Sequence, residues 1–99
     1  MATQSRDAAK FTDENPFPIL RVSEDGVILY ANDPAKIVLQ AWKAETGESV
    51  PTEIAGIVGR CSINHKGENL EISIDDQFFV LTFTPIWGAG YVNIYGREV

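Results

Sequence analysis

Cysteine is almost absent from this chain of 99 residues, because Cys61 is the only one. A single cysteine cannot form a disulfide within the chain, and it cannot supply the thiolate cluster of a structural zinc site. Low cysteine content is also typical of proteins from a reducing compartment. The sequence therefore excludes a small disulfide-held fold and predicts one domain built around a hydrophobic core.

Long hydrophobic runs are absent as well. The longest of note cover residues 27–31 and 78–83, far short of the ~20 residues that a membrane-spanning helix needs. The first six residues, Met-Ala-Thr-Gln-Ser-Arg, lack the apolar stretch of a signal peptide. We therefore expect a cytoplasmic domain with no membrane contact, or a piece of a longer protein whose targeting signal lies elsewhere.

Positive charge is scarce. Eight Lys and Arg residues face fourteen Asp and Glu residues, which gives a formal net charge of −6. The basic residues are scattered along the chain, so they cannot form a stripe that would neutralise a row of phosphates. The sequence predicts no nucleic-acid binding, and the acidic balance mainly favours solubility.

Catalytic motifs are also missing. The chain has no Ser/His/Asp order, no glycine-rich phosphate loop and no pair of histidines at helical spacing. Asp75 and Asp76 are adjacent carboxylates, but they stand in a short turn with no third acidic neighbour, so we interpret them as solvated. We expect no catalytic residues, no metal site and no enzymatic activity of the chain itself.

The first half of the chain has a strong hairpin signal. Residues 19–22 and 27–31 are rich in strand formers, and an Asp-Gly turn at residues 25–26 separates them. After Asn32, Asp33 is the candidate cap of a helix with Pro34 at its first position. This helix is expected to end at Gly47. Ser49 is the candidate cap of a second helix, which opens at Val50 and Pro51.

The second helix carries one apolar stripe, and the period then changes from 3.6 to 2. Strands are expected at residues 70–74, 78–87 and 91–95, with an optional helix within residues 1–15 in front of the whole pattern. This order predicts an α+β domain. The long strand at 78–87 is apolar on both faces, so both need cover. The central helices cover one face, and the N-terminal helix, a second chain or both cover the other.

Three stretches together resemble a PAS domain. Residues 25–32, Asp-Gly-Val-Ile-Leu-Tyr-Ala-Asn, are similar to the family's opening pattern D-G-x-I-x-x-x-N. Residues 78–86 are similar to its penultimate strand, and residues 90–99 to its ending in bacterial sensor kinases and cyclic-dinucleotide enzymes. The resemblance covers residues 14–99 and leaves 1–13 as a cap or linker. It implies a five-stranded antiparallel sheet in the order 2-1-5-4-3, with Ile28 on an edge strand.

The resemblance also implies a pocket between the helices and the sheet. The inward phase of the long strand is left open. Any ligand should be small and mostly apolar, with a polar edge contacted by Asn93 or Thr82. The cofactor is left open. Haem is not expected, because His65 lies outside the apolar stripe of the helix. Flavin photochemistry is not expected either, because Cys61 lacks the Asn-Cys-Arg-Phe-Leu-Gln context of flavin-photoreactive members. The expected lining consists of Trp42, Ile54, Ile57, Val58, Phe79, Leu81, Phe83 and Asn93.

The C-terminal residues Arg97, Glu98 and Val99 occupy the positions from which the family passes its signal to an attached output domain. The resemblance implies a basic partner for Glu98 at this exit. Our leading hypothesis is a regulatory sensor or interaction domain of a bacterial signal-transduction protein, such as a two-component system, that responds to a small ligand or a partner. The alternative is a structural homodimerisation module with a filled core. A homodimer is expected through residues 1–13 and the outer sheet face.

Overall fold

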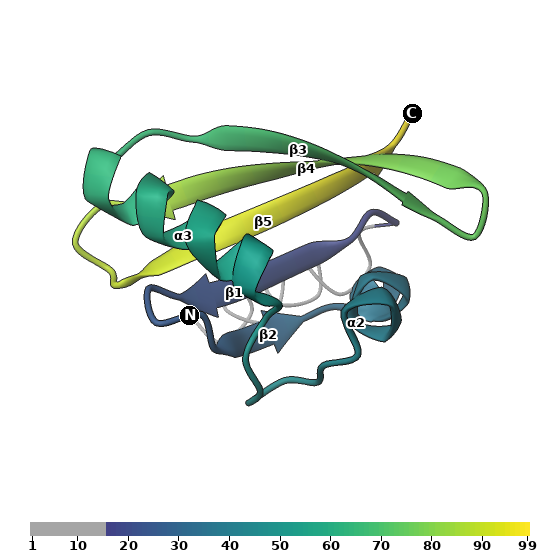
Figure 1. Cartoon of the computed structure of the whole chain (residues 1–99), viewed down its shortest axis with the longest axis horizontal. Coiled ribbons are helices and arrows are strands. Elements are labelled where there is room, and N and C mark those ends of the chain that lie inside the picture. The colour runs from purple at the N-terminus through teal and green to yellow at the C-terminus, as the bar shows by residue number, and fades with distance from the viewer. Residues whose placement is uncertain (1–15) are drawn as a thin grey trace, which may run out of the picture.

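One antiparallel sheet organises the computed structural model, which describes residues 16–99, and its strand order is β2-β1-β5-β4-β3 (Figure 1). This confirms the predicted α+β class and the predicted order. The expected N-terminal helix and the boundary at residues 13 and 14 lie outside the described residues. The elements are β1 (Ile19–Ser23), β2 (Ile28–Ala31), the 3-10 helix η1 (Asp33–Ala35), α2 (Lys36–Trp42), α3 (Thr52–Asn64), β3 (Glu68–Ile74), β4 (Gln77–Ile86) and β5 (Tyr91–Glu98).

The opening hairpin forms as predicted. Gly26 has a φ of 90°, which a residue with a side chain rarely adopts, and the Ser23 hydroxyl accepts a hydrogen bond from the Val27 N–H at 3.0 Å. β1 then pairs on its other side with β5, so the first and last strands are neighbours at the centre of the sheet. Ile28 lies on the edge strand β2 and is fully buried.

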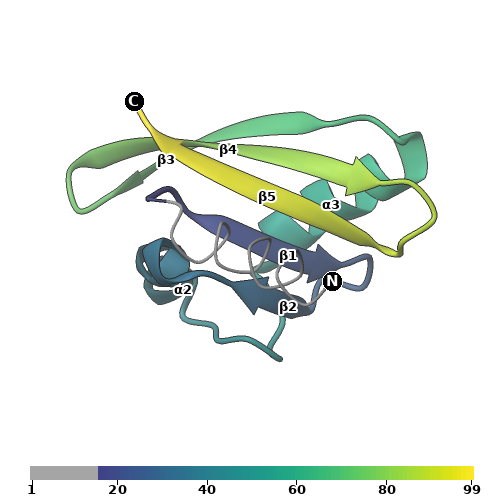
Figure 2. The same ribbon diagram turned by 180° about the vertical axis from the view of Figure 1, so that it is seen from behind.

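Helices cover one face of the sheet. The apolar stripe of α3 (Ile54, Ile57, Val58 and Cys61) is buried, as its spacing predicts. In Figure 1 α3 crosses in front of β4 and β5, and in Figure 2 the sheet lies in front of it. Of the described helices, none has both the length and the apolar composition to span a membrane.

The helix boundaries correct three expectations. Asn32, not Asp33, caps the first helix, because its Oδ1 accepts a hydrogen bond from the Ala35 N–H at 3.1 Å. The helix ends at Trp42 rather than at Gly47, because Lys43 adopts a left-handed conformation with φ of 55°. That conformation is commonest for glycine, but the chain turns here without one.

Ser49 does not cap α3, whose first residue follows Pro51 with no side-chain cap. Ser49 instead belongs to a short segment that pairs with the free edge of β2. Here the Ile28 N–H donates to the Glu48 carbonyl at 2.9 Å, and the Gly47 N–H donates to the Ile28 carbonyl at 2.7 Å. The segment at residues 47–50 therefore covers the start of β2 at this edge of the sheet, whereas β3 forms the opposite edge.

β3 and β5 are longer than predicted, whereas β4 has the predicted ten residues and is shifted by one position, from 78–87 to 77–86. β4 already begins at Gln77, and β5 continues to Glu98 rather than ending at Tyr95. β5 extends past Tyr95 because Gly96 lies close to Pro18, and the Gly96 N–H donates to the Pro18 carbonyl at 2.8 Å. The absence of a side chain lets β5 continue past the start of β1, and pairing with β4 holds it as far as Glu98.

Candidate functional site

Six of the eight expected pocket residues lie together on the helix side of the sheet. In the middle of the long strand β4, residues 79, 81 and 83 are buried and the residues between them are not, and this settles the inward phase of the strand. Each of the six is at most 6% exposed, and they belong to one cluster that also contains Leu20, Val22, Val92 and Ile94. α3 contributes three of them and β4 the other three: Ile54, Ile57 and Val58, and Phe79, Leu81 and Phe83.

Trp42, the seventh expected residue, is half-buried at the C-terminal end of α2 and packs against this cluster. The described core members are hydrocarbon side chains and the thiol of Cys61. Among residues 16–99, Asn32 is the one buried polar residue, and its side chain is held by backbone groups. The expected lining is therefore a packed hydrophobic layer.

Asn93 is a correction to the expected lining. On β5 the buried residues are Val92 and Ile94, so the side chain of Asn93 lies on the opposite, outer face of the sheet. Thr82 is paired with Tyr95 and lies on that outer face too. Strand alternation thus separates both polar candidates from the apolar lining. The sequence did not show this separation, because it left the inward phase of the long strand open.

The outer face instead carries a connected polar and aromatic cluster. The Arg21 Nε donates a hydrogen bond to the Asn93 Oδ1 at 2.9 Å, and the Asn93 Nδ2 donates to the Tyr95 hydroxyl at 3.2 Å. The Arg21 guanidinium lies 4.0 Å from the centre of the Tyr91 ring, a cation–π distance. Sequence reasoning missed this cluster, although Tyr91, Asn93 and Tyr95 alternate along one strand.

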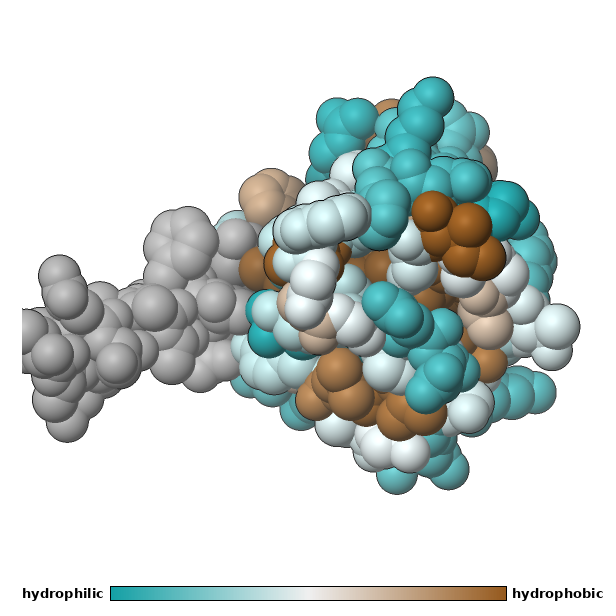
Figure 3. All heavy atoms as spheres, turned by 90° about the vertical axis from the view of Figure 1, so that its left-hand side faces the viewer, coloured by the Kyte–Doolittle hydropathy of each residue, from teal (hydrophilic) through white to brown (hydrophobic). Residues whose placement is uncertain are grey.

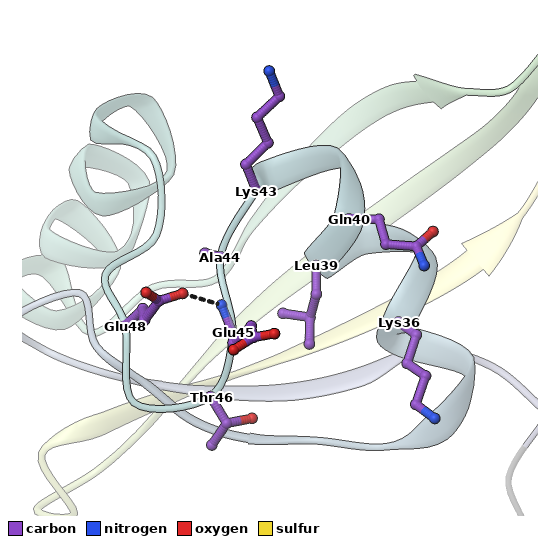
Figure 4. Close-up of a pocket in the computed structure, with 8 residues that line it drawn as sticks. All are labelled: Lys36, Leu39, Gln40, Lys43, Ala44, Glu45, Thr46 and Glu48. Atoms are coloured by element: carbon purple, nitrogen blue, oxygen red, sulfur yellow. Dashed lines mark hydrogen bonds between the residues drawn. The ribbon is translucent and has the colours of Figure 1, made fainter.

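A pocket of about 800 Å³ lies outside the core, between α2 and the loop that follows it (Figure 4). Leu39 points into it, while the side chain of Lys43 points away. The loop is braced by the Glu45 N–H, which donates to the Glu48 Oε1 at 2.8 Å. Both signs of charge line this open pocket, and they do not converge on one point. Its lining consists of Lys36, Leu39, Gln40, Lys43, Ala44, Glu45, Thr46 and Glu48.

A second pocket, of about 400 Å³, lies between α2 and the end of the β3–β4 hairpin. Apolar atoms of α2 form one wall, and β3 ends at the other. Its lining mixes small apolar, amide, hydroxyl and carboxylate groups. The residues are Ile37, Gln40, Ala41, Ser73, Ile74 and Asp75.

The single histidine and the single cysteine lie apart from both pockets. His65 is the exposed C-cap of α3, and its ring lies 4.4 Å from the ring of Trp87. Cys61 is buried on the helix stripe, and burial raises the pKa of its thiol. Within residues 16–99, no three His, Cys, Asp or Glu residues are grouped closely enough to hold a metal ion.

One exposed end of the molecule is partly hydrophobic. Ile63 and Trp87 are 78% and 79% exposed at the end of α3 and at the β4–β5 turn. Figure 3 views the left-hand side of Figure 1, where hydrophobic residues form separate patches between hydrophilic ones. Nearby, Arg60 and Glu68 form a two-bonded ion pair at 2.9 and 3.1 Å, which raises the pKa of Arg60 and lowers that of Glu68.

The expected output residues lie at the end of the central strand. Arg97 and Glu98 are exposed but still paired with β4, and the Val99 N–H donates to the Phe78 carbonyl at 2.8 Å. The ion pairs within residues 16–99 join Lys36 to Asp33 and Arg60 to Glu68. The described part of the chain therefore does not supply the basic partner that the resemblance implies for Glu98.

Comparison with known proteins identifies the fold. No family model and no curated protein matches the chain. Among solved structures, a domain of a sensory box sensor histidine kinase/response regulator from Geobacter sulfurreducens matches with a TM-score of 0.69 and 12% identity, over 97% of this chain and 95% of that one.

Two further neighbours have the same architecture. The photoactive yellow protein domain of the sensor histidine kinase Ppr from Rhodospirillum centenum has a TM-score of 0.64 and 16% identity, with 90% of each chain covered. The PAS domain of nitrogen regulation protein NR(II) from Vibrio parahaemolyticus has a TM-score of 0.61 and 12% identity, with 93% of this chain and 97% of that one covered. The chain therefore has the PAS fold.

Proposed function

Starting from the PAS fold, we propose that this chain is a cytoplasmic regulatory domain of a bacterial signal-transduction protein. It responds to a small ligand or a partner and biases an attached output domain. Its structural neighbours include domains of sensor histidine kinases, which supports a signalling role. The chain itself performs no catalysis in this proposal.

One observation carries the proposal: β5 connects the core to the chain end. It lies between β1 and β4, it packs against α3, and it ends at the exposed residues Arg97 and Glu98. Val92 and Ile94 on this strand are fully buried against the same core as the α3 stripe. A shift of α3 therefore reaches the exit through a single strand, because close-packed interiors transmit displacement.

A ligand, in this proposal, would be apolar and would contact Ile54 and Phe83 between α3 and β4. Native mass spectrometry of the protein purified from its own host tests this directly, because a retained ligand adds a discrete mass. Retention in the wild type and its loss in Ile54→Ala are expected if a ligand is the input. A bare mass in both proteins would leave a partner as the input.

Signal output has its own test in the full-length protein. Arg97→Ala and Glu98→Ala alter the exit without touching the core, so they should change the response of the output activity while leaving the thermal unfolding of the domain within a few degrees. The exposed Glu53→Ala on α3 is the matched control. An output response that both exit variants leave unchanged would remove residues 97–99 from the signalling route.

The second candidate function is a structural homodimerisation module with a filled core. The packing of Phe79, Phe83 and Trp42 favours it, because these large side chains occupy the space that an internal ligand would need. In this candidate the outer sheet face, with Tyr95 half-exposed on it, meets a second copy. Sedimentation of the full chain and of a chain lacking residues 1–13 tests it. A dimer weakened by the deletion is expected, whereas a monomer at high micromolar concentration would contradict it.

A further inference from the structure

The two edges of the sheet differ. Residues 47–50 exchange backbone hydrogen bonds with Gly26 and Ile28 and so cover the start of the β2 edge. β3 is the other edge strand, and no described segment pairs with its outer side. In Figures 1 and 2 no labelled element lies beyond β3 in the plane of the sheet. The described part of the chain therefore covers part of one edge of its sheet and leaves the other edge open.

The turn geometry fixes which backbone groups point outward from β3. Asp75 and Asp76 both have positive φ, 50° and 67°, so they form a two-residue hairpin turn between the paired residues Ile74 and Gln77. The residues that flank such a turn bond to each other, and bonded pairs then alternate along an antiparallel ladder. The N–H and carbonyl groups of Asn69, Glu71 and Ser73 therefore point to the open edge, and all three residues are exposed.

This edge lacks most of the usual obstacles to strand addition, and the charged side chains of β3 are the two carboxylates Glu68 and Glu71. Soluble proteins block edge strands with charged side chains, above all lysine, and with proline, bulges or short length. β3 has seven residues, contains neither proline nor lysine, and keeps an unbroken register with β4. In contrast, the β1–β2 pairing has an irregularity between Arg21 and Val22. The edge of β3 is thus long and regular enough to accept another strand.

We propose that the open edge of β3 binds an extended basic segment of a partner protein, which adds to the sheet as a further strand. The charge of the edge selects this occupant. Glu71, Asp75 and Asp76 are exposed along the edge and its turn, and Glu68 is held by Arg60. Lysine or arginine side chains on the partner strand would lie beside these carboxylates.

The apolar side of β3 selects the alternating pattern of that segment. Leu70 and Ile72 point toward the core but are only half-buried. Apolar side chains at every second position of an added strand would lie beside them and extend the core. The pocket of about 400 Å³ at the end of β3 gives one such side chain a place between Ile37 and Ile74.

A second copy of this chain fits the edge less well. Antiparallel pairing of two β3 strands about their middle would bring the Glu71 residues of both copies close together, and like charges across a ladder destabilise it. Each chain also carries a net charge of −6. A basic partner strand satisfies the same backbone groups without this repulsion.

The test uses the full chain and a synthetic peptide of alternating lysine and valine with blocked ends, matched in length to the seven residues of β3. We expect the peptide to bind, with weaker binding as salt rises. We also expect amide hydrogen exchange of Asn69, Glu71 and Ser73 to slow at saturating peptide, because their N–H groups become bonded. A peptide of alternating glutamate and valine should leave these rates unchanged.

Two substitutions at one position separate charge from strand addition. Glu71→Gln removes the carboxylate and keeps the N–H, so its dissociation constant for the lysine–valine peptide should rise by up to about fivefold. Glu71→Pro also removes the outward N–H, which β4 does not use, and should raise the constant by about a further tenfold. Thermal unfolding of both variants checks that the sheet remains intact.

Several outcomes would overturn the proposal. Equal binding by Glu71→Gln and Glu71→Pro would exclude backbone pairing at this edge. Unchanged exchange of the three amides with bound peptide would place the peptide elsewhere, and this measurement on the wild type holds even where the proline variant fails to fold. A dimer of the chain alone that Glu71→Pro dissociates would make a second copy the occupant instead.

Discussion

The Oδ1 of Asn32 accepts a hydrogen bond from the N–H of Ile19 at 2.9 Å, across thirteen residues of chain. The same oxygen accepts from the Ala35 N–H, and the Asn32 Nδ2 donates to the Phe17 carbonyl at 2.9 Å. One buried amide thus joins the start of β1, the end of β2 and the first helical turn. Its role is structural, as expected for an asparagine in a cap position.

Replacement of Asn32 by alanine should destabilise the domain by about 2–3 kcal/mol, because buried backbone donors and an acceptor lose their partner. Urea unfolding followed by far-UV circular dichroism measures this. Asp33→Ala is the matched control, since the Asp33–Lys36 pair is highly exposed. It should change the stability by less than about 0.5 kcal/mol. A larger loss for Asp33→Ala would make Asp33 the effective cap.

Gly96→Ala should be destabilising by about 1–3 kcal/mol, because a Cβ there would lie 3.1 Å from the Pro18 Cβ and 3.2 Å from the Leu81 Cδ2. Gly59→Ala on α3 is the control, since its Cβ would meet nothing within 4 Å. It should stabilise by about 0.5–1 kcal/mol through helix propensity. Opposite signs in denaturant unfolding are expected, and two stabilising substitutions would disprove the tight contact at Gly96.

The Arg60–Glu68 pair predicts a pH dependence of stability. The hydrogen bond from Arg60 lowers the pKa of Glu68 in the folded state. The stabilisation is therefore present above the unfolded pKa of Glu68 and is lost as the pH falls through the lowered folded value. Thermal unfolding of the wild type and of Glu68→Gln at low salt should converge toward acid pH. A constant difference between them across the acid range would contradict the prediction.

Cys61 should react slowly with a thiol reagent in the native protein and quickly in denaturant, because it is buried and its pKa is raised by burial. The matched control combines Cys61→Ala with Ile63→Cys, which moves the thiol to an exposed position two residues away. That variant should label quickly in the native state. Rapid native labelling of the wild type would show that the stripe of α3 opens readily.

Much of the fold could be predicted from the sequence, because its signals are local. The hairpin around Gly26 and the stripe from Ile54 to Cys61 depend only on residues that are close together in the sequence, and the structure confirms both. The order of the strands is predicted by the resemblance to the PAS family, which rests on three motifs that follow one another in the family's order.

The features that the sequence did not predict depend on contacts between residues that are far apart in the chain. Apolar residues on both faces of β4 left its inward phase undecided, and with it the side of the sheet on which Asn93 lies. Asn32 and Asp33 are both good caps, and only the nearby β1 backbone decides between them. The Arg21–Asn93 hydrogen bond joins residues 72 apart in sequence, beyond the reach of any local pattern.

The segment that covers the start of β2 also bears on the order in which the domain assembles. The Val50 N–H donates to the Gly26 carbonyl at 2.9 Å, so β2, α2 and the loop after it form a unit whose ends meet. Closing a short loop costs less entropy than a long one. The centre of the sheet needs β1 and β5, from opposite ends of the described chain. During synthesis the local unit can therefore form early, while β1 stays unpaired on its β5 side until the last strand leaves the ribosome.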